Sequence, residues 1–139
     1  MKTLFASCLT LTLLLVPALG QSGLTARGQG AILRGLDKVS GQTTDLALAV
    51  GDTVDYGRLR VHLAECRFPA DDPSSDAFAE LTIDDRAANK TVFSGWMIAS
   101  SPALSALDDA RYDIWVMSCS NDSASGTSAA NPAGDSVSE

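Results

Sequence analysis

The sequence predicts a mainly β protein: a small antiparallel β-sandwich or flattened barrel with one short helix and one disulfide. Short runs with a hydrophobic residue at every second position recur through the middle of the chain, which is the period of half-buried strands. Turn-forming glycine, proline, asparagine and aspartate residues separate these runs at regular intervals. Once the N-terminal leader is set aside, Cys66 and Cys119 are the one pair that can form an intramolecular disulfide.

The N-terminus, residues 1–20, has the pattern of a secretory signal peptide. Lys2 precedes an apolar run, and small residues precede the expected cleavage site after Gly20. The run is shorter than the ~20 residues that span a bilayer, and Pro17 closes it, so no membrane span is expected. Cys8 lies inside the run and is expected to leave with the leader. The sequence therefore predicts a periplasmic or secreted protein.

The rest of the chain divides into three parts by composition. Residues 21–29 contain glycine, serine and threonine without an apolar period and are interpreted as a flexible lead-in. Residues 30–119 form the predicted β domain. Residues 120–139 have no aromatic residue and only Val137 as a large aliphatic, so they are expected to be a disordered tail.

Within the first half of the domain, three alternating runs predict strands at residues 31–36, 44–50 and 59–63. The side-chain period places Cys66 opposite the leucines of the third run, so we expect either a β-bulge before it or a position at a sheet edge. Arg58, Arg60 and Arg67 gather near the same run and are interpreted as a solvated face.

Prolines and aspartates fill residues 68–76, which are predicted to be a solvated loop. Clustered carboxylates can bind calcium, but their spacing here fits no EF-hand. The pairs Asp84-Asp85 and Asp108-Asp109 are interpreted in the same way, as turns. A strand is expected at residues 77–83, followed by a polar hairpin connection over residues 84–90.

Residues 91–99 predict a strand that is apolar on both faces and hence central or covered on its second side. Ser101 and Pro102 then predict the start of a helix of about two turns, with Leu104 and Leu107 three residues apart and facing the core. The last strand is expected at residues 111–119, and it carries Cys119. The disulfide is therefore expected to join the third alternating run to the last strand.

Composition and motifs argue against catalysis and against several classes of ligand. The net charge of −7 and the absence of a basic stripe disfavour nucleic acid and anionic lipid. His62 is the one histidine, no nucleophile elbow or phosphate-binding glycine loop is present, and one histidine with two distant cysteines gives no zinc spacing. We therefore expect a non-enzymatic protein without metal or cofactor.

Two hypotheses for function follow. The first is a protein-interaction module that docks on a membrane-associated complex at the inner membrane through its acidic loop or its tail. The second is a module that binds glycan or peptidoglycan, with exposed aromatic side chains as stacking platforms, for which Trp96, Trp115, Tyr112 and Phe93 are the candidates. Aromatic residues on alternating strands with aliphatic neighbours also belong to cores, so exposure of the tryptophans separates the alternatives.

Two segments of the chain carry a resemblance: GAILRGLDKVSGQTTDLALAVGDTVDYGRLRVHLAECRF, residues 30–68, and VFSGWMIASSPALSALDDARYDIWVMSC, residues 92–119. They resemble a family of small exported proteobacterial proteins known as a domain of unknown function. Members similar to this chain are often encoded beside an accessory subunit of a mitochondrial-type respiratory complex I. The resemblance implies an accessory role on the periplasmic side of that enzyme, and it implies no functional residues.

Overall fold

The structure, a computed structural model, describes residues 23–121, and the predicted signal peptide and nearly all of the expected tail lie outside them. Within this range the chain forms eight strands and one 3-10 helix. In chain order these are β1 (Thr25–Arg27), β2 (Gly30–Asp37), β3 (Gln42–Ala49), β4 (Thr53–Tyr56), β5 (Leu59–Pro69), β6 (Phe78–Asp85), β7 (Lys90–Ile98), η1 (Pro102–Leu104) and β8 (Tyr112–Ser120).

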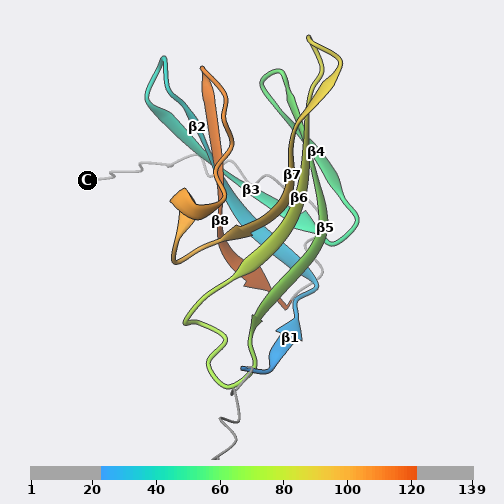
Figure 1. The fold of residues 1–139 in the computed structure, drawn as a ribbon, viewed down its shortest axis with the longest axis vertical. Helices are drawn as coiled ribbons and strands as arrows, with labels where there is room; N and C mark the ends of the chain where they lie inside the picture. Colours follow the sequence, from blue (N-terminus) through green and yellow to red (C-terminus); the bar gives the residue numbers. More distant parts are fainter. Residues whose placement is uncertain (1–22, 122–139) are drawn as a thin grey trace, which may run out of the picture.

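The strands form two antiparallel sheets that pack face to face (Figure 1). The larger sheet has the order β1-β5-β6-β7, and β4 pairs with β5 on the same side as β1. The smaller sheet has the order β3-β2-β8. The two sheets do not close on each other, so the predicted β-sandwich is confirmed and the flattened barrel is not.

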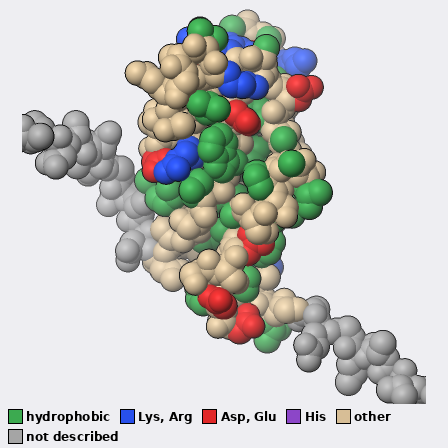
Figure 2. Space-filling model, turned by 90° about the vertical axis from the view of Figure 1, so that its left-hand side faces the viewer, with side chains coloured by type: hydrophobic (Ala, Val, Ile, Leu, Met, Phe, Trp, Pro, Cys, Tyr) green, Lys and Arg blue, Asp and Glu red, His purple; other side chains and the backbone are tan. Residues whose placement is uncertain are grey.

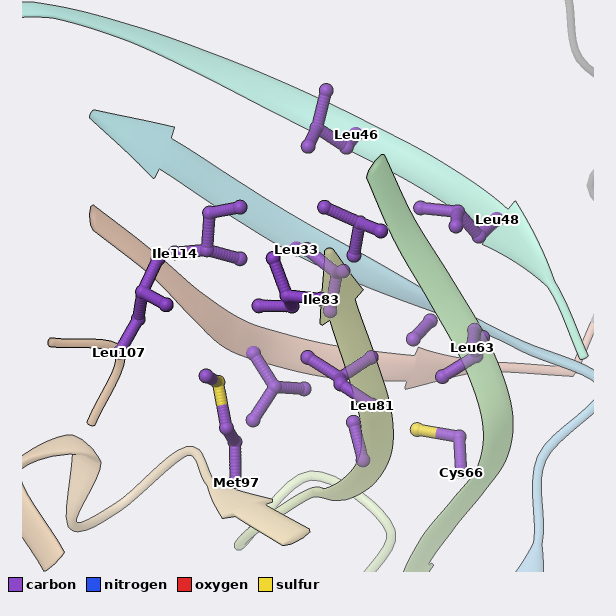
Figure 3. Close-up of a cluster of buried hydrophobic side chains, with 14 of the residues drawn as sticks. Leu33, Leu46, Leu48, Leu63, Cys66, Leu81, Ile83, Met97, Leu107 and Ile114 are labelled. Carbon is purple, nitrogen blue, oxygen red and sulfur yellow. The ribbon is translucent and has the colours of Figure 1, made fainter. Parts of the chain in front are cut away.

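The core lies between the sheets and is built from the side chains that point inward from the strands of both sheets (Figure 3). In β5 fully buried residues alternate with exposed or half-buried ones from Leu59 to Leu63, as its period-two pattern predicts. The smaller sheet contributes Leu33, Leu46, Leu48, Ile114 and Val116, and the larger sheet contributes Leu59, Val61, Leu63, Leu81, Ile83 and Met97.

A disulfide between Cys66 and Cys119 joins β5 to β8, with the two Cα atoms 5.8 Å apart. The pairing of β5 with β6 shifts between Leu63 and Glu65, and this bulge turns Cys66 into the core, where it is fully buried. The predicted bridge is confirmed, and of the two alternatives for Cys66, a preceding bulge or a position at a sheet edge, the structure has the bulge.

The predicted flexible lead-in is wrong where it overlaps β1. Ala26 pairs with Phe68 in an antiparallel ladder, and the amide of Gly28 donates to the carbonyl oxygen of Cys66 at 2.8 Å. Backbone hydrogen bonds hold this segment in place. Such bonds do not depend on the side chains, so the sequence shows no alternation of hydrophobic residues here.

The sequence predicts at residues 91–99 a strand that is central or covered on its second side, and the central position is wrong, because β7 is the last strand of the larger sheet. Met97 faces the core and is buried, whereas Trp96 points away and is 36% exposed. Both faces of β7 carry apolar residues although the strand lies at the edge, so the composition of this strand does not indicate its position in the sheet.

The predicted helix is reduced to the single 3-10 turn η1, which starts with Pro102 as expected. The side chain of Ser101 makes no capping hydrogen bond. Leu107 is buried as predicted, but Leu104 is 77% exposed, since a 3-10 turn followed by extended chain does not place these two residues on one face.

Candidate interaction surface

The densest group of charged side chains lies at the end of the sandwich where β5 and β8 begin. Arg58, in the turn between β4 and β5, donates from Nε to Oδ2 of Asp85 at 2.8 Å and from Nη2 to Oδ2 of Asp109. Asp85 ends β6 in the larger sheet, and Asp109 lies just before β8 in the smaller one. Arg58 therefore joins the two sheets at the end opposite the disulfide.

Both carboxylates are held on their second oxygen by backbone amides. Oδ1 of Asp85 accepts from the amides of Ala87 and Ala88, at 2.8 and 3.0 Å. The pKa of Asp85 lies below its usual value, first because the Arg58 guanidinium donates to the carboxylate and then because the Ala88 amide does. Asp85 is 7% exposed, so its interpretation as a solvated turn residue is wrong.

Asp109 has the same kind of environment. Its Oδ1 accepts from the amides of Arg111 and Tyr112, at 2.9 and 2.8 Å. Burial acts to raise the pKa of Asp109, but these amides and the charge of Arg58 leave it below the usual value. Its side chain is 5% exposed, which again differs from the predicted solvated turn.

Tyr112 lies between two guanidinium groups and is buried, so it is not available as a stacking platform. The Cζ atoms of Arg58 and Arg111 lie 5.4 and 5.2 Å from the centre of its ring. Tyr56 meets the same ring edge-on, with 5.4 Å between the ring centroids. Within residues 23–121 no buried side-chain nitrogen or oxygen lacks a hydrogen-bond partner, so this cluster is a satisfied structural network rather than an open polar site.

A hollow of about 310 Å³ beside the β6–β7 hairpin is lined by charged residues. Two of its cations, Arg60 and Arg86, pair with Asp55 at 3.2 and 3.1 Å. Thr91 donates to Asp84 at 2.6 Å. Because carboxylates match the arginines, the hollow lacks the excess positive charge that would hold an anion.

His62 is half-buried and hydrogen-bonded on the outer side of β5. Its Nδ1 lies 3.2 Å from Oγ1 of Thr53 and 3.1 Å from the carbonyl oxygen of Asp52. In the part of the chain that the structure describes, no three histidine, cysteine, aspartate or glutamate residues gather as metal ligands.

The two tryptophans lie on opposite outer faces of the sandwich. Trp115 is flanked in β8 by the buried Ile114 and Val116, so it points outward from the smaller sheet. Trp96 precedes the buried Met97 in β7 and points outward from the larger sheet. With Tyr112 buried, the three predicted residues do not form one binding surface.

Exposed apolar side chains gather instead where the η1 segment runs along β8. A hollow of about 400 Å³ is lined there by Pro102, Ala103, Ala106, Asp113, Ile114 and Trp115. Leu104 projects from the same segment, and Met117, two residues after Trp115, is 40% exposed. Figure 2 views the side on which η1, β8 and the β2–β3 hairpin lie, and shows hydrophobic side chains interspersed with polar ones on that face.

The sequence did not indicate this surface, because the expected two-turn helix puts Leu104 on the side that faces the core. A signal was nevertheless present in the segment from Ser100 to Ser105, where three serines and Pro102 disfavour a continued helix. The sequence likewise did not indicate that Arg58 is an inter-sheet partner, since its two carboxylates are distant in the chain.

Fold and surface together define a disulfide-bonded β-sandwich with apolar side chains exposed beside one edge of the smaller sheet. The chain belongs to the family described as "Uncharacterized protein conserved in bacteria (DUF2155)", whose model matches residues 31–119. This match confirms the resemblance to a family of unknown function.

The chain is also similar to "Uncharacterized protein RP359" of Rickettsia prowazekii (strain Madrid E), with 25% identity over 87 residues. That match covers 60% of this chain and 56% of the relative, so the chain spans little more than half of the relative's length. No solved structure matches the chain. Within residues 23–121 the structure has no helix that is long and apolar enough to cross a membrane.

Proposed function

We propose that this protein is a non-enzymatic accessory module that binds another protein on the periplasmic side of the inner membrane. The observation that carries the proposal is the exposed apolar group at the η1 segment, where Leu104 is 77% exposed and follows Ala103, which lines the hollow together with Trp115. Apolar side chains exposed around a concave surface are typical of protein-binding sites.

The polar groups support a binding role rather than catalysis. The most buried charged side chains, Asp85 and Asp109, are fully engaged by Arg58 and by backbone amides. They hold the two sheets in place and present no free acid, base or nucleophile to a substrate. A rigid sandwich with an apolar surface fits recognition of a partner better than it fits a reaction.

The resemblance to exported proteins encoded beside an accessory subunit of respiratory complex I makes that enzyme the first partner to test. The tagged protein would be expressed in its native host and purified from detergent-solubilised membranes, with mass spectrometry of the bound proteins. We expect subunits of an inner-membrane complex to be recovered at a fixed ratio to the tagged protein.

Two variants with the same chemistry locate the binding surface. Leu104→Glu introduces a charge beside the hollow, whereas Val39→Glu introduces it at a side chain that is 76% exposed in the β2–β3 turn. Leu104→Glu should abolish recovery of the partner, and Val39→Glu should leave it unchanged. Recovery of the tagged protein alone, or equal recovery with both variants, would contradict the proposal.

A further inference from the structure

The outer edge of β7 presents backbone hydrogen-bonding groups that no described strand uses. The amide of Ala99 donates to the carbonyl oxygen of Ala77 at 2.9 Å, and this bond fixes which residues of β7 face β6. By the alternation of an antiparallel ladder, the amide and carbonyl groups of Ser94 and Trp96 point away from β6. Both residues are exposed, so the edge is accessible.

The other outer edges of the described sheets carry charges that oppose strand pairing. Arg27 lies on β1, Asp45 on β3 and Asp55 on β4, and each takes part in an ion pair. On β8 the carboxylate of Asp113 accepts from the next amide at 3.0 Å, which blocks an outward donor. In contrast, residues 92–98 of β7 contain no charged residue and no proline. An edge without such protection is a template for another strand.

We propose that β7 pairs antiparallel with β7 of a second copy of this chain, which joins two larger sheets into one continuous sheet across a two-fold axis. The axis would pass beside Gly95, so that Ser94 faces Trp96 of the second copy on each side of the axis, while Val92, the unpaired residue of the β-bulge in β7, lies outside this ladder. In this register the outward amide and carbonyl groups of Ser94 meet those of Trp96 of the second copy.

The side chains around Gly95 suit this self-pairing. A Cβ built at Gly95 has one neighbour within 4 Å, the ring of Phe93 at 4.0 Å, so two backbones can approach there. Val92 and Phe93 are half-buried in one copy, and a second copy beside β7 would cover them further.

The absence of charged residues from residues 92–98 lets the edge of β7 pair with the same edge of a second copy, whereas the charges on the other described edges oppose such pairing. The proposed register brings no two like charges opposite each other, because residues 92–98 contain no charged residue. The net charge of −7 on each chain opposes association over longer distances. The dimer should therefore become tighter as salt screens this repulsion, by a few-fold in Kd between about 50 and 500 mM salt.

The first test uses the predicted mature protein, residues 21–139, with its disulfide formed. Size-exclusion chromatography with light scattering should show a shift from one copy to two as the concentration rises. Under the same conditions amide hydrogen exchange at Ser94 and Trp96 should slow by roughly tenfold or more. A single copy at every concentration, or a dimer in which these two amides exchange as in the monomer, would overturn the proposal.

The second test checks the register by exchanging charges. The double variants Ser94→Glu with Trp96→Glu and Ser94→Lys with Trp96→Lys should each remain single copies, since like charges then face each other across the axis. Mixing the two should restore a dimer with one copy of each.

Ala47→Lys provides a matched control, because Ala47 is exposed on β3, at the outer edge of the smaller sheet. It should leave the dimer unchanged. A dimer that survives both charged pairs but is lost with Ala47→Lys would place the contact elsewhere. Because Leu104 lies outside β7, Leu104→Glu should also leave the dimer intact, which separates this inference from the proposed partner site.

Discussion

Gly57 lies directly against the ring of Tyr112, so closely that a Cβ built on Gly57 would be 2.4 Å from both Cζ and Oη of the tyrosine. Gly57 belongs to the β4–β5 turn and Tyr112 begins β8, so this contact brings the larger and smaller sheets together. It also holds Tyr112 in place between Arg58 and Arg111.

Gly57→Ala should therefore destabilise the fold by roughly 2–4 kcal/mol, since it combines a steric clash in a packed site with a left-handed backbone, φ +58°. Gly41→Ala is the matched control, because Gly41 has φ +73° but no atom within 4 Å of the added carbon. That variant should cost only about 1 kcal/mol. Urea unfolding measures both, and equal losses would mean that the Tyr112 contact does not restrict position 57.

Replacing Arg58 tests the ion pairs that join the sheets. Arg58→Met should lower the urea midpoint markedly, because it leaves the carboxylates of Asp85 and Asp109 buried without their cation. Arg60→Met is the control, since Arg60 pairs with Asp55 at 3.2 Å and both side chains are about half exposed. Its effect should be close to zero. A loss as large for Arg60→Met would contradict the special role of Arg58.

Acid should weaken the same region in a defined direction. The pKa values of Asp85 and Asp109 lie below their ordinary values in the folded state. A carboxyl group with a lowered folded pKa contributes its stability above the unfolded value of about 4, and loses it as the pH falls through the folded value.

Urea unfolding at a series of pH values from 7 to 2 should show a loss of stability that begins below about pH 4. Asp85→Asn should be less stable than the parent at pH 7, and the difference between the two should shrink toward pH 2. A constant difference over this range would show that the ionised form of Asp85 does not contribute.

The disulfide should supply a large part of the stability of this domain. Cys66 and Cys119 are separated by 53 residues, and closing a loop of this length is worth about 4 kcal/mol in the chain-entropy account. The double variant Cys66→Ala with Cys119→Ala should lose about that amount in urea unfolding. In the parent protein a thiol reagent should label neither cysteine before reduction, and native labelling of either one would contradict the bridge.

Much of the fold follows from local patterns in the sequence. The alternation of leucine and valine with polar residues in β5 identifies a half-buried strand, because residues two apart share one face of a sheet. The parity of Cys66 indicates either a bulge or a position at a sheet edge, and the register of β5 with β6 decides for the bulge.

Other features depend on contacts between distant residues and leave no local pattern. β1 is held by backbone pairing with β5, which any short segment can make. The partners of Arg58, Asp85 and Asp109, lie 27 and 51 residues away in the chain. The sequence therefore does not distinguish an aspartate in a solvated turn from an aspartate that is buried against an arginine.

The sequence by itself determined the β class, most of the strands and the pairing of Cys66 with Cys119. The period of the side chains can be read within each short segment, and two cysteines outside the leader leave one possible intramolecular pair. Only the tertiary structure decided that β7 is an edge, that Tyr112 is buried and that Trp96 and Trp115 face opposite sides. These properties depend on strand order and on which faces pack together, and such long-range packing is a property of the whole fold rather than of any segment.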